Sequence, residues 1–240
     1  MIMPVVQRIQ NKLEHIIRDP LFCSKFLAVN ALPKLSRYIY AKNSSVFAGQ
    51  SYFILSFDCD TNKDIEVVSD VHNRLKELGV IPAYAVPGEL LETGRHTYKK
   101  LHLDGAEFLN HGYKSHTDYH EKTKTYVSTL FYDQLSIEEV ENDVVSGHDA
   151  VQRVIGSAPK GFRTPHFGTF QGRRDLDGLY NLLFDLGYTY SSSTTPITGI
   201  FEGAFIRQKT GLIELPVSGC FDYPGRIIDS WSFRFSQTRK

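Results

Sequence analysis

The sequence has no excess of charge of either sign, because 27 lysine and arginine residues balance 27 aspartate and glutamate residues. A protein that binds nucleic acid or an anionic membrane through its overall charge carries a surplus of positive side chains that release counterions. The balance therefore predicts no nucleic-acid partner. It is more typical of a protein that takes a small or neutral polar substrate.

Cysteine is also scarce. Cys23, Cys59 and Cys220 are odd in number, far apart in the sequence and without a CxxC pair. The pattern indicates neither a disulfide framework nor a zinc knuckle, and it favours a reducing compartment.

Long apolar runs are missing as well. No stretch approaches the roughly 18 apolar residues of a membrane-spanning helix, and the first residues lack the uninterrupted apolar core of a signal peptide. We therefore predict no integral membrane segment and a cytoplasmic protein. Residues 21–40 mix apolar and basic side chains and could lie on a membrane face or a partner, although a helix packed on the domain is the simpler expectation. Nothing in the sequence indicates an oligomeric state.

What remains is the pattern of one α/β domain of 240 residues, of which 41% are hydrophobic. Residues 1–48 are predicted to form an N-terminal helical extension, with helices interrupted at Pro20 and Pro33. The main domain is predicted over residues 49–240. Strands are expected at residues 51–58, 80–86, 106–109, 160–163, 188–191 and 212–217, and helices at residues 64–79, 98–103, 136–155 and 176–186.

Strands that alternate with helices indicate a parallel sheet, and about six such units indicate a barrel or a doubly wound sheet. The helix at residues 136–155 opens with Ser136 followed by Glu139, which is a capping box. Residues 112–134 are too polar for a core and are predicted to form an irregular functional loop.

Polar side chains follow three of the predicted strands. Asp58 and Asp60 follow the first, His111 follows the strand at residues 106–109, and Arg163 ends the strand at residues 160–163. In parallel α/β folds the carboxyl ends of the strands lie at one edge of the sheet, where active sites form. These side chains are therefore the first candidates for chemistry.

Two aspartates separated by one residue can do different work, since one carboxylate can bind a cation while the other acts as a base. One of them could instead cap the next helix. His111, His116 and His120 lie within ten residues, and two imidazoles with one carboxylate make a metal site with open positions. Solvated loop histidines are the alternative. Together the two groups predict a divalent-metal hydrolase.

Four blocks of the sequence, in this order, resemble the polysaccharide deacetylases of carbohydrate esterase family 4: residues 55–60, 82–88, 105–113 and 161–167. The resemblance spans about residues 51–217. It implies a distorted (β/α) barrel of about seven parallel strands and a catalytic domain at residues 49–240. It also implies metal-assisted hydrolysis of an N-acetyl group on a sugar or glycan. The implied metal is zinc, with cobalt, nickel or manganese as other candidates.

The resemblance also implies roles for residues. Asp58 would be the general base, Arg163 would pair with it and hold it ionised, and Asp60 would be a metal ligand with two histidines. A buried structural ion pair is the alternative for Arg163. The expected substrate-side residues are Tyr113, whose neighbouring backbone amide would stabilise an oxyanion, Pro165 and His166.

The chain departs from the family in the spacing of its histidines. The family spaces its two ligand histidines four residues apart, whereas His111 and His116 are five apart and His116 and His120 are four apart. We prefer His111 with His116, because the strand end aligns at His111 and the extra residue can form a bulge at Lys114. His120 remains a substitute.

A second departure concerns the acid. The family carries a late leucine-x-histidine block, but no histidine follows His166 in this sequence. Either the sequence stops early, or another group such as His166 or metal-bound water donates the proton, or the protein is inactive. We therefore also consider an amidohydrolase of a small non-sugar amide and a catalytically inactive carbohydrate-binding protein. The hydroxyls of residues 190–196 could bind sugar oxygens or form a solvated turn.

Overall fold

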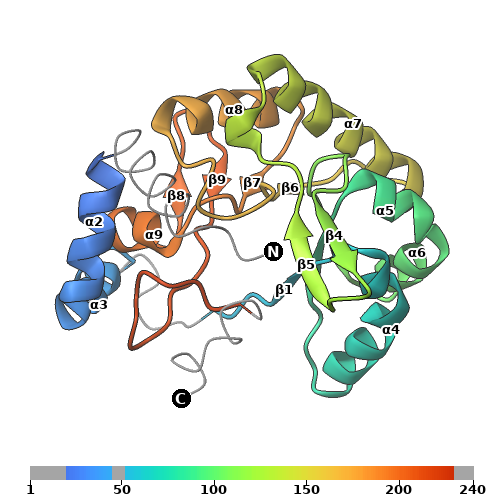
Figure 1. Cartoon of the computed structure of the whole chain (residues 1–240), viewed down its shortest axis with the longest axis horizontal. Coiled ribbons are helices and arrows are strands. Elements are labelled where there is room, and N and C mark those ends of the chain that lie inside the picture. Colours follow the sequence, from blue (N-terminus) through green and yellow to red (C-terminus); the bar gives the residue numbers. More distant parts are fainter. Residues whose placement is uncertain (1–19, 45–51, 230–240) are drawn as a thin grey trace. The chain divides into compact units, whose positions relative to one another are not determined.

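The computed structural model describes residues 20–44 and 52–229 (Figure 1). The chain divides into two compact units, which are described separately here. One comprises Met1–Ala48, Thr194–Ile206 and Leu215–Lys240, and the other comprises Gly49–Ser193 and Arg207–Glu214. The division predicted at residues 48 and 49 stays a prediction, and the helices expected within residues 1–19 lie outside the described residues.

A mostly parallel sheet forms the centre of the larger unit. Its order is β1-β2-β3-β6-β7-β9-β8, and each adjacent pair from β1 to β9 is parallel. The strands are β1 (Ser56–Asp58), β2 (Ala83–Val86), β3 (Glu107–Asn110), β6 (Gly161–Phe162), β7 (Tyr190–Ser191), β8 (Ile206–Arg207) and β9 (Ile213–Glu214). The predicted α/β class with a parallel sheet is confirmed. Within the described residues, β1 and β8 stand at opposite ends of the order, so the barrel is not closed.

Helices lie along the outer side of the sheet in Figure 1. They are α4 (Asn62–Glu77), α5 (Gly88–Thr93), α6 (Arg95–Leu103), α7 (Ile137–Ile155) and α8 (Arg173–Asp185), with the short 3-10 helix η2 (Tyr132–Gln134) before α7. The capping box predicted for α7 is confirmed, because the Glu139 amide donates to the Ser136 hydroxyl and the Ser136 amide donates to the Glu139 carboxylate. The helix ends at Ile155, and the capping residue Gly156 has a φ of 95°, which favours glycine.

Two apolar cores hold the helices on the sheet. One joins β1 to β3 with α4 to α7 around Tyr84, Leu91 and Tyr98, and the other joins α7 and α8 around Phe162 and Leu183. All five of these side chains are fully buried. Burial of this much apolar surface stabilises the strand ends that carry the candidate site.

Residues 112–134 are not wholly irregular as predicted. They contain an antiparallel hairpin of β4 (Thr117–His120) and β5 (Thr125–Ser128). The prediction was wrong because each strand has only four residues and its half-buried side carries a single large apolar ring, Tyr119 or Tyr126, which is too short a pattern to mark a strand. The predicted strand at residues 51–58 is also shorter in the structure, since only Ser56–Asp58 pair with β2.

In the smaller unit, the described residues contain α2 (Pro20–Ala31), α3 (Pro33–Asn43) and α9 (Pro196–Glu202). The predicted break at Pro33 is confirmed, and the proline starts α3, where its missing amide costs nothing. The Asn43 amide group donates to the carbonyls of Ile200 and Phe201, which ties the end of α3 to α9. Among the described helices, none has both the length and the apolar character to cross a membrane.

Candidate metal centre and catalytic site

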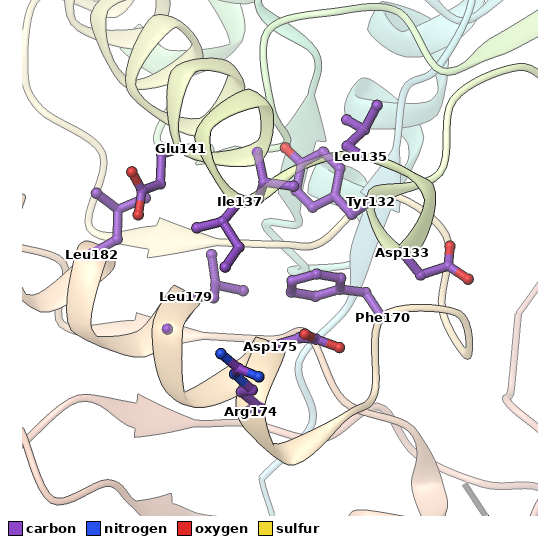
Figure 2. Close-up of a pocket in the computed structure, with 12 residues that line it drawn as sticks. Tyr132, Asp133, Leu135, Ile137, Glu141, Phe170, Arg174, Asp175, Leu179 and Leu182 are labelled. Carbon is purple, nitrogen blue, oxygen red and sulfur yellow. The ribbon is translucent and has the colours of Figure 1, made fainter. Parts of the chain in front are cut away.

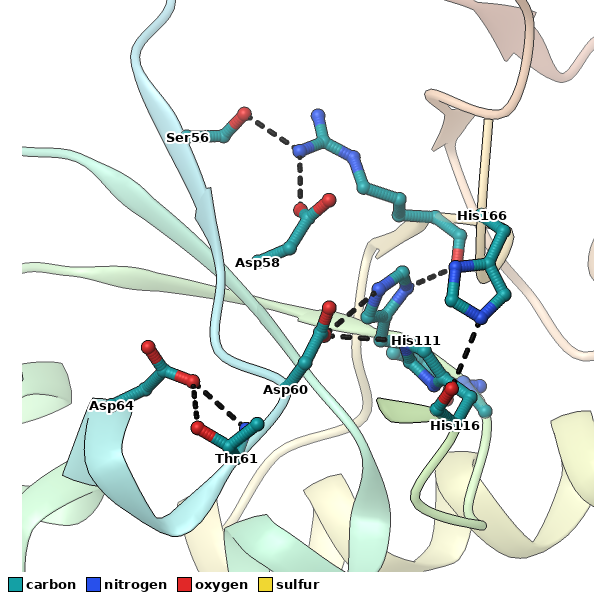
Figure 3. Close-up of polar contacts among 11 residues, drawn as sticks. Ser56, Asp58, Asp60, Thr61, Asp64, His111, His116 and His166 are labelled. Atoms are coloured by element: carbon teal, nitrogen blue, oxygen red, sulfur yellow. Dashed lines mark hydrogen bonds and ion pairs between the residues drawn. The ribbon is translucent and has the colours of Figure 1, made fainter. Parts of the chain in front are cut away.

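The candidate site lies at the carboxyl ends of β1, β3 and β6, as predicted from the strand pattern (Figure 3). Asp58 is the last residue of β1, His111 directly follows β3, and Arg163 directly follows β6. The pairing of Asn110 with Phe162 places the ends of β3 and β6 level with each other. The sheet therefore brings together residues that are more than 100 positions apart in the sequence.

Asp60, His111 and His116 converge on one point. The Oδ1 atom of Asp60 lies 3.1 Å from Nε2 of His116 and 3.5 Å from Nε2 of His111. One ligand atom of each residue falls within a group no wider than 4.8 Å. Both histidines are 1% exposed, so these two are not solvated loop histidines. Two imidazole nitrogens and one carboxylate oxygen are a donor set typical of zinc and related ions, with positions left for water and substrate.

The surroundings of His111 fix the roles of its two ring nitrogens. The Nδ1 atom of His111 lies 2.8 Å from the backbone carbonyl of Arg163. A carbonyl only accepts hydrogen bonds, so Nδ1 carries a proton, and Nε2 is the nitrogen that can bind a cation or, when protonated, donate to Asp60. Metal-binding histidines are commonly oriented by such a carbonyl.

The charges and donor atoms of the site favour a positive charge at its centre. The buried Oδ1 atom of Asp60 makes no hydrogen bond of normal geometry, although the Nε2 atoms of His111 and His116 both face it. Burial raises the pKa of the Asp60 carboxyl, but the two imidazoles outweigh burial and hold this pKa well below its ordinary value. Burial lowers the pKa of His111, but contact with Asp60 outweighs it and the pKa is raised. The residues therefore fit a divalent cation.

Asp60 lies directly before the start of α4. Thr61 is the residue that caps α4, and its amide and hydroxyl both donate to the Asp64 carboxylate. Neither Asp58 nor Asp60 caps the helix, so the alternative structural use of these two aspartates does not apply. Both carboxylates remain available to the site.

Asp58 is aimed by Arg163. The Nη1 atom of Arg163 donates to Asp58 at 2.7 Å and to the Ser56 hydroxyl at 2.8 Å, and Nη2 donates to the Ser192 hydroxyl at 3.1 Å. Arg163 is 6% exposed, whereas the side chain of Asp58 is 29% exposed. A buried guanidinium with three oxygen partners cannot easily move, so the Asp58 carboxylate is held in one direction while still reaching solvent.

Serine hydroxyls at the end of β7 and directly after it support this arrangement. Ser191, Ser192 and Ser193 are buried, which fits neither a solvated turn nor an open sugar-binding surface. Ser192 accepts from Arg163, and the hydroxyl of Ser193 accepts from the Thr164 amide. They support the segment that carries Arg163.

The loop from His111 to His116 is held by residues that sequence reasoning missed. Asp143 of α7 is buried and accepts from the Lys114 amide at 2.9 Å and from the Tyr132 hydroxyl at 2.7 Å. Glu89 of α5 accepts from the Ser115 amide at 2.7 Å. One signal was present, because Asp143 lies within the apolar stripe of α7 between Val140 and Val144. A charged residue in such a stripe needs a buried partner.

His116, and not His120, joins the cluster. His120 is the last residue of β4 and is exposed. His116 precedes β4, in the loop that Asp143 and Glu89 hold. Residues 111–116 form neither helix nor strand, and the bulge expected at Lys114 stays a prediction.

Gly147 gives a test of how closely α7 packs on this loop. A Cβ atom there would lie 2.2 Å from Asn110 Oδ1 and 2.6 Å from the Gly112 carbonyl. We expect Gly147→Ala to destabilise the protein by about 1–3 kcal/mol in urea unfolding, because the clash outweighs the higher helix propensity of alanine. Gly178→Ala is the matched control on α8, where a Cβ meets nothing within 4 Å. It should stabilise by about 0.5–1 kcal/mol, and equal effects at the two positions would contradict close packing at Gly147.

Residues 48–191 match the sequence profile of the polysaccharide deacetylase family, which is more than half of the 240 residues. The chain belongs to the polysaccharide deacetylase family. The matched region contains Asp58, Asp60, His111, His116 and Arg163. The resemblance predicted from the four sequence blocks is therefore confirmed.

Several solved structures are similar to this family member. One is a Mycobacterium smegmatis protein described as a polysaccharide deacetylase, which is 19% identical in sequence and has a TM-score of 0.47. The match covers 69% of this chain and 58% of that one. Another is a family 4 carbohydrate esterase from Streptomyces lividans in complex with acetate, with 17% identity and a TM-score of 0.43 over 60% and 62% of the two chains. A peptidoglycan deacetylase from Bacillus subtilis has 21% identity and a TM-score of 0.38 over 49% and 50%. The chain thus spans about half to three fifths of the length of these structures. No curated protein matches it.

Tyr113 and Pro165, two of the residues expected to contact substrate, are described by their surroundings alone. The Tyr113 hydroxyl donates to Glu92 of α5 at 3.3 Å. Pro165 is buried. Their contact with substrate stays a prediction.

His166 borders the cluster directly. Its Nε2 atom lies 3.1 Å from the His116 carbonyl, and its ring meets the His116 ring edge-on at 4.9 Å. Its backbone is left-handed, with a φ of 57°, which is strained for a residue other than glycine. Burial lowers the pKa of His166 to about 4, so the ring is neutral near pH 7.

A separate hollow lies between α7, α8 and η2 (Figure 2). It is lined mainly by apolar side chains, including Tyr132, Phe170 and Leu179. None of the residues predicted for the metal centre or catalysis lines it. The hollow therefore belongs to the packing of α7 on α8 and not to the candidate site.

Proposed function

We propose that this chain is a metal-dependent hydrolase that removes an N-acetyl group from a sugar or a glycan precursor. The observation that carries the proposal is the convergence of Asp60, His111 and His116 next to a carboxylate, Asp58, that a buried arginine holds in place. Membership of the polysaccharide deacetylase family supports the substrate class.

Asp60, His111 and His116 would hold the ion. Two imidazoles with one carboxylate favour zinc, and cobalt, nickel or manganese are other candidates for the same ligands. The ion would supply Lewis-acid polarisation of the acetamide carbonyl.

Asp58 supplies the base in this proposal. Its carboxylate takes a proton from the attacking water as the new carbon–oxygen bond forms. Arg163 keeps the carboxylate aimed, and a backbone amide near Tyr113 stabilises the oxyanion. The carbon–nitrogen bond then breaks, and the amine leaves with the proton that Asp58 had taken. His166 is a poor donor for this step, since its low pKa leaves it neutral at pH 7.

The cytoplasm is our proposed location, on the ground of the three cysteines without a pairing pattern in the sequence. An N-acetylated sugar or glycan is the proposed partner of the site, and nucleic acid is not. A soluble or lipid-linked precursor fits equally.

The direct test measures acetate release from N-acetylated oligosaccharides with zinc or cobalt added. We expect acetate from the sugars and little from small non-sugar acetamides. The reverse preference would favour the related amidohydrolase. Stoichiometric metal binding without any product would instead favour an inactive carbohydrate-binding protein.

A further inference from the structure

The two described helices near the N-terminus expose large apolar side chains to solvent. Leu21 is 64% exposed, Leu27 69% and Tyr38 66%. Phe26, Leu32 and Leu35 are also exposed. Such a concentration of exposed large apolar side chains within 18 residues is unusual for a surface that contacts only water.

The exposed side of α2 is apolar in composition. Its exposed positions include residues 21, 24, 27, 28 and 31, which recur at spacings of three and four and so share one face. Ser24 is the one polar residue among them. The opposite side carries Val29, which is buried. A helix that is apolar on its inner and its outer side is typical of one that is covered on both.

Basic side chains accompany this apolar surface. Residues 20–44 contain Lys25, Lys34, Arg37 and Lys42 and no aspartate or glutamate. Lys34 and Lys42 are exposed on α3, where they flank Leu35 and Tyr38. Lys25 and Arg37 lie over the rings of Phe201 and Phe221 within the same unit.

We propose that this α2–α3 face, residues 20–42, docks on an anionic lipid surface. Apolar side chains beside lysines with no acidic residue match a membrane interface, where the apolar groups enter the acyl boundary and the lysines meet lipid phosphates. A second copy of the chain fits less well, because it would bring the exposed Lys34 and Lys42 of one copy toward those of the other with no acidic residue of the face between them. The inference goes beyond the proposed hydrolysis and does not depend on it.

The experiment is co-sedimentation of the full chain with vesicles. One set contains phosphatidylcholine and phosphatidylglycerol in roughly equal parts, and the other contains phosphatidylcholine alone. We expect binding to the mixed vesicles that salt weakens, and little binding to phosphatidylcholine. Leu27→Ser with Tyr38→Ser should weaken binding at least about tenfold, because each loses apolar burial. Lys34→Gln with Lys42→Gln should weaken it about fivefold per lysine.

Matched controls lie in the other unit. Leu103→Ser removes a leucine at the end of α6 that is 79% exposed, more than Leu27, and Lys99→Gln removes an exposed lysine. Both should bind vesicles as the unchanged protein does. All variants change exposed side chains, and circular dichroism checks their fold.

Three results would overturn the proposal. Equal binding to both vesicle types would remove the role of anionic lipid, and unchanged binding of the α2–α3 variants would place the contact elsewhere. No vesicle binding together with a dimer in sedimentation, dissociated by Leu27→Ser with Tyr38→Ser, would make the face a contact between copies of the chain. Acetate release is measured separately, so failure here leaves the proposed hydrolysis untouched.

Discussion

Replacing Asp58 with asparagine should reduce acetate release by about 10²–10⁴-fold, the usual contribution of a general base, while zinc binding is retained. The asparagine oxygen can still accept from Arg163, so the geometry at the end of β1 is preserved, but the amide cannot take a proton from water. The ligand atoms of Asp60, His111 and His116 are unchanged by this substitution. The measurement is kcat for acetate release beside zinc stoichiometry on the same preparation.

The matched control for Asp58→Asn is Asp70→Asn, which neutralises an exposed carboxylate on α4. We expect it to keep full activity. If Asp58→Asn retained activity within a few-fold of the unchanged protein, Asp58 would not be the base. The Asp58 and Arg163 pair would then be a structural ion pair, as the sequence alone also allowed.

Replacing His116 with alanine should abolish the stabilisation that zinc gives to the folded protein. An ion that binds only the folded state adds about 2.7 kcal/mol at roughly 100 times its Kd. For a chain of this size, this corresponds to a rise in Tm of about 5–10 °C. His116→Ala removes one of the three converging ligands, so the rise should disappear. Thermal unfolding with and without zinc measures it, and the comparison uses the shift rather than the Tm itself.

His120→Ala is the matched control, because it removes a histidine four residues further on that is exposed on β4. Its zinc-dependent rise in Tm should equal that of the unchanged protein. The opposite pattern, loss in His120→Ala and retention in His116→Ala, would assign the second ligand to His120. This experiment reports on metal binding without requiring turnover, so it separates the metal centre from catalysis.

The sequence by itself determined the parts of this protein that depend on neighbours along the chain. The capping box of α7 joins Ser136 to Glu139, three residues apart, and so it could be read directly. The same is true of the strand ends at Asp58 and His111, since a short apolar run followed by polar residues marks where a buried strand stops. These local signals were enough to predict the class of fold and the edge of the sheet where the candidate residues gather.

Only the tertiary structure decided which residues meet across the sheet. The choice of His116 over His120 follows from the hold of Asp143 and Glu89 on the loop, and both belong to helices outside it. The sequence likewise did not predict the hairpin of β4 and β5 or the burial of Ser192 beside Arg163. Hydrogen bonds between distant segments form only once the core has packed, and they leave no periodic trace in the sequence. The spacing of residues therefore located the site, and long-range packing selected its members.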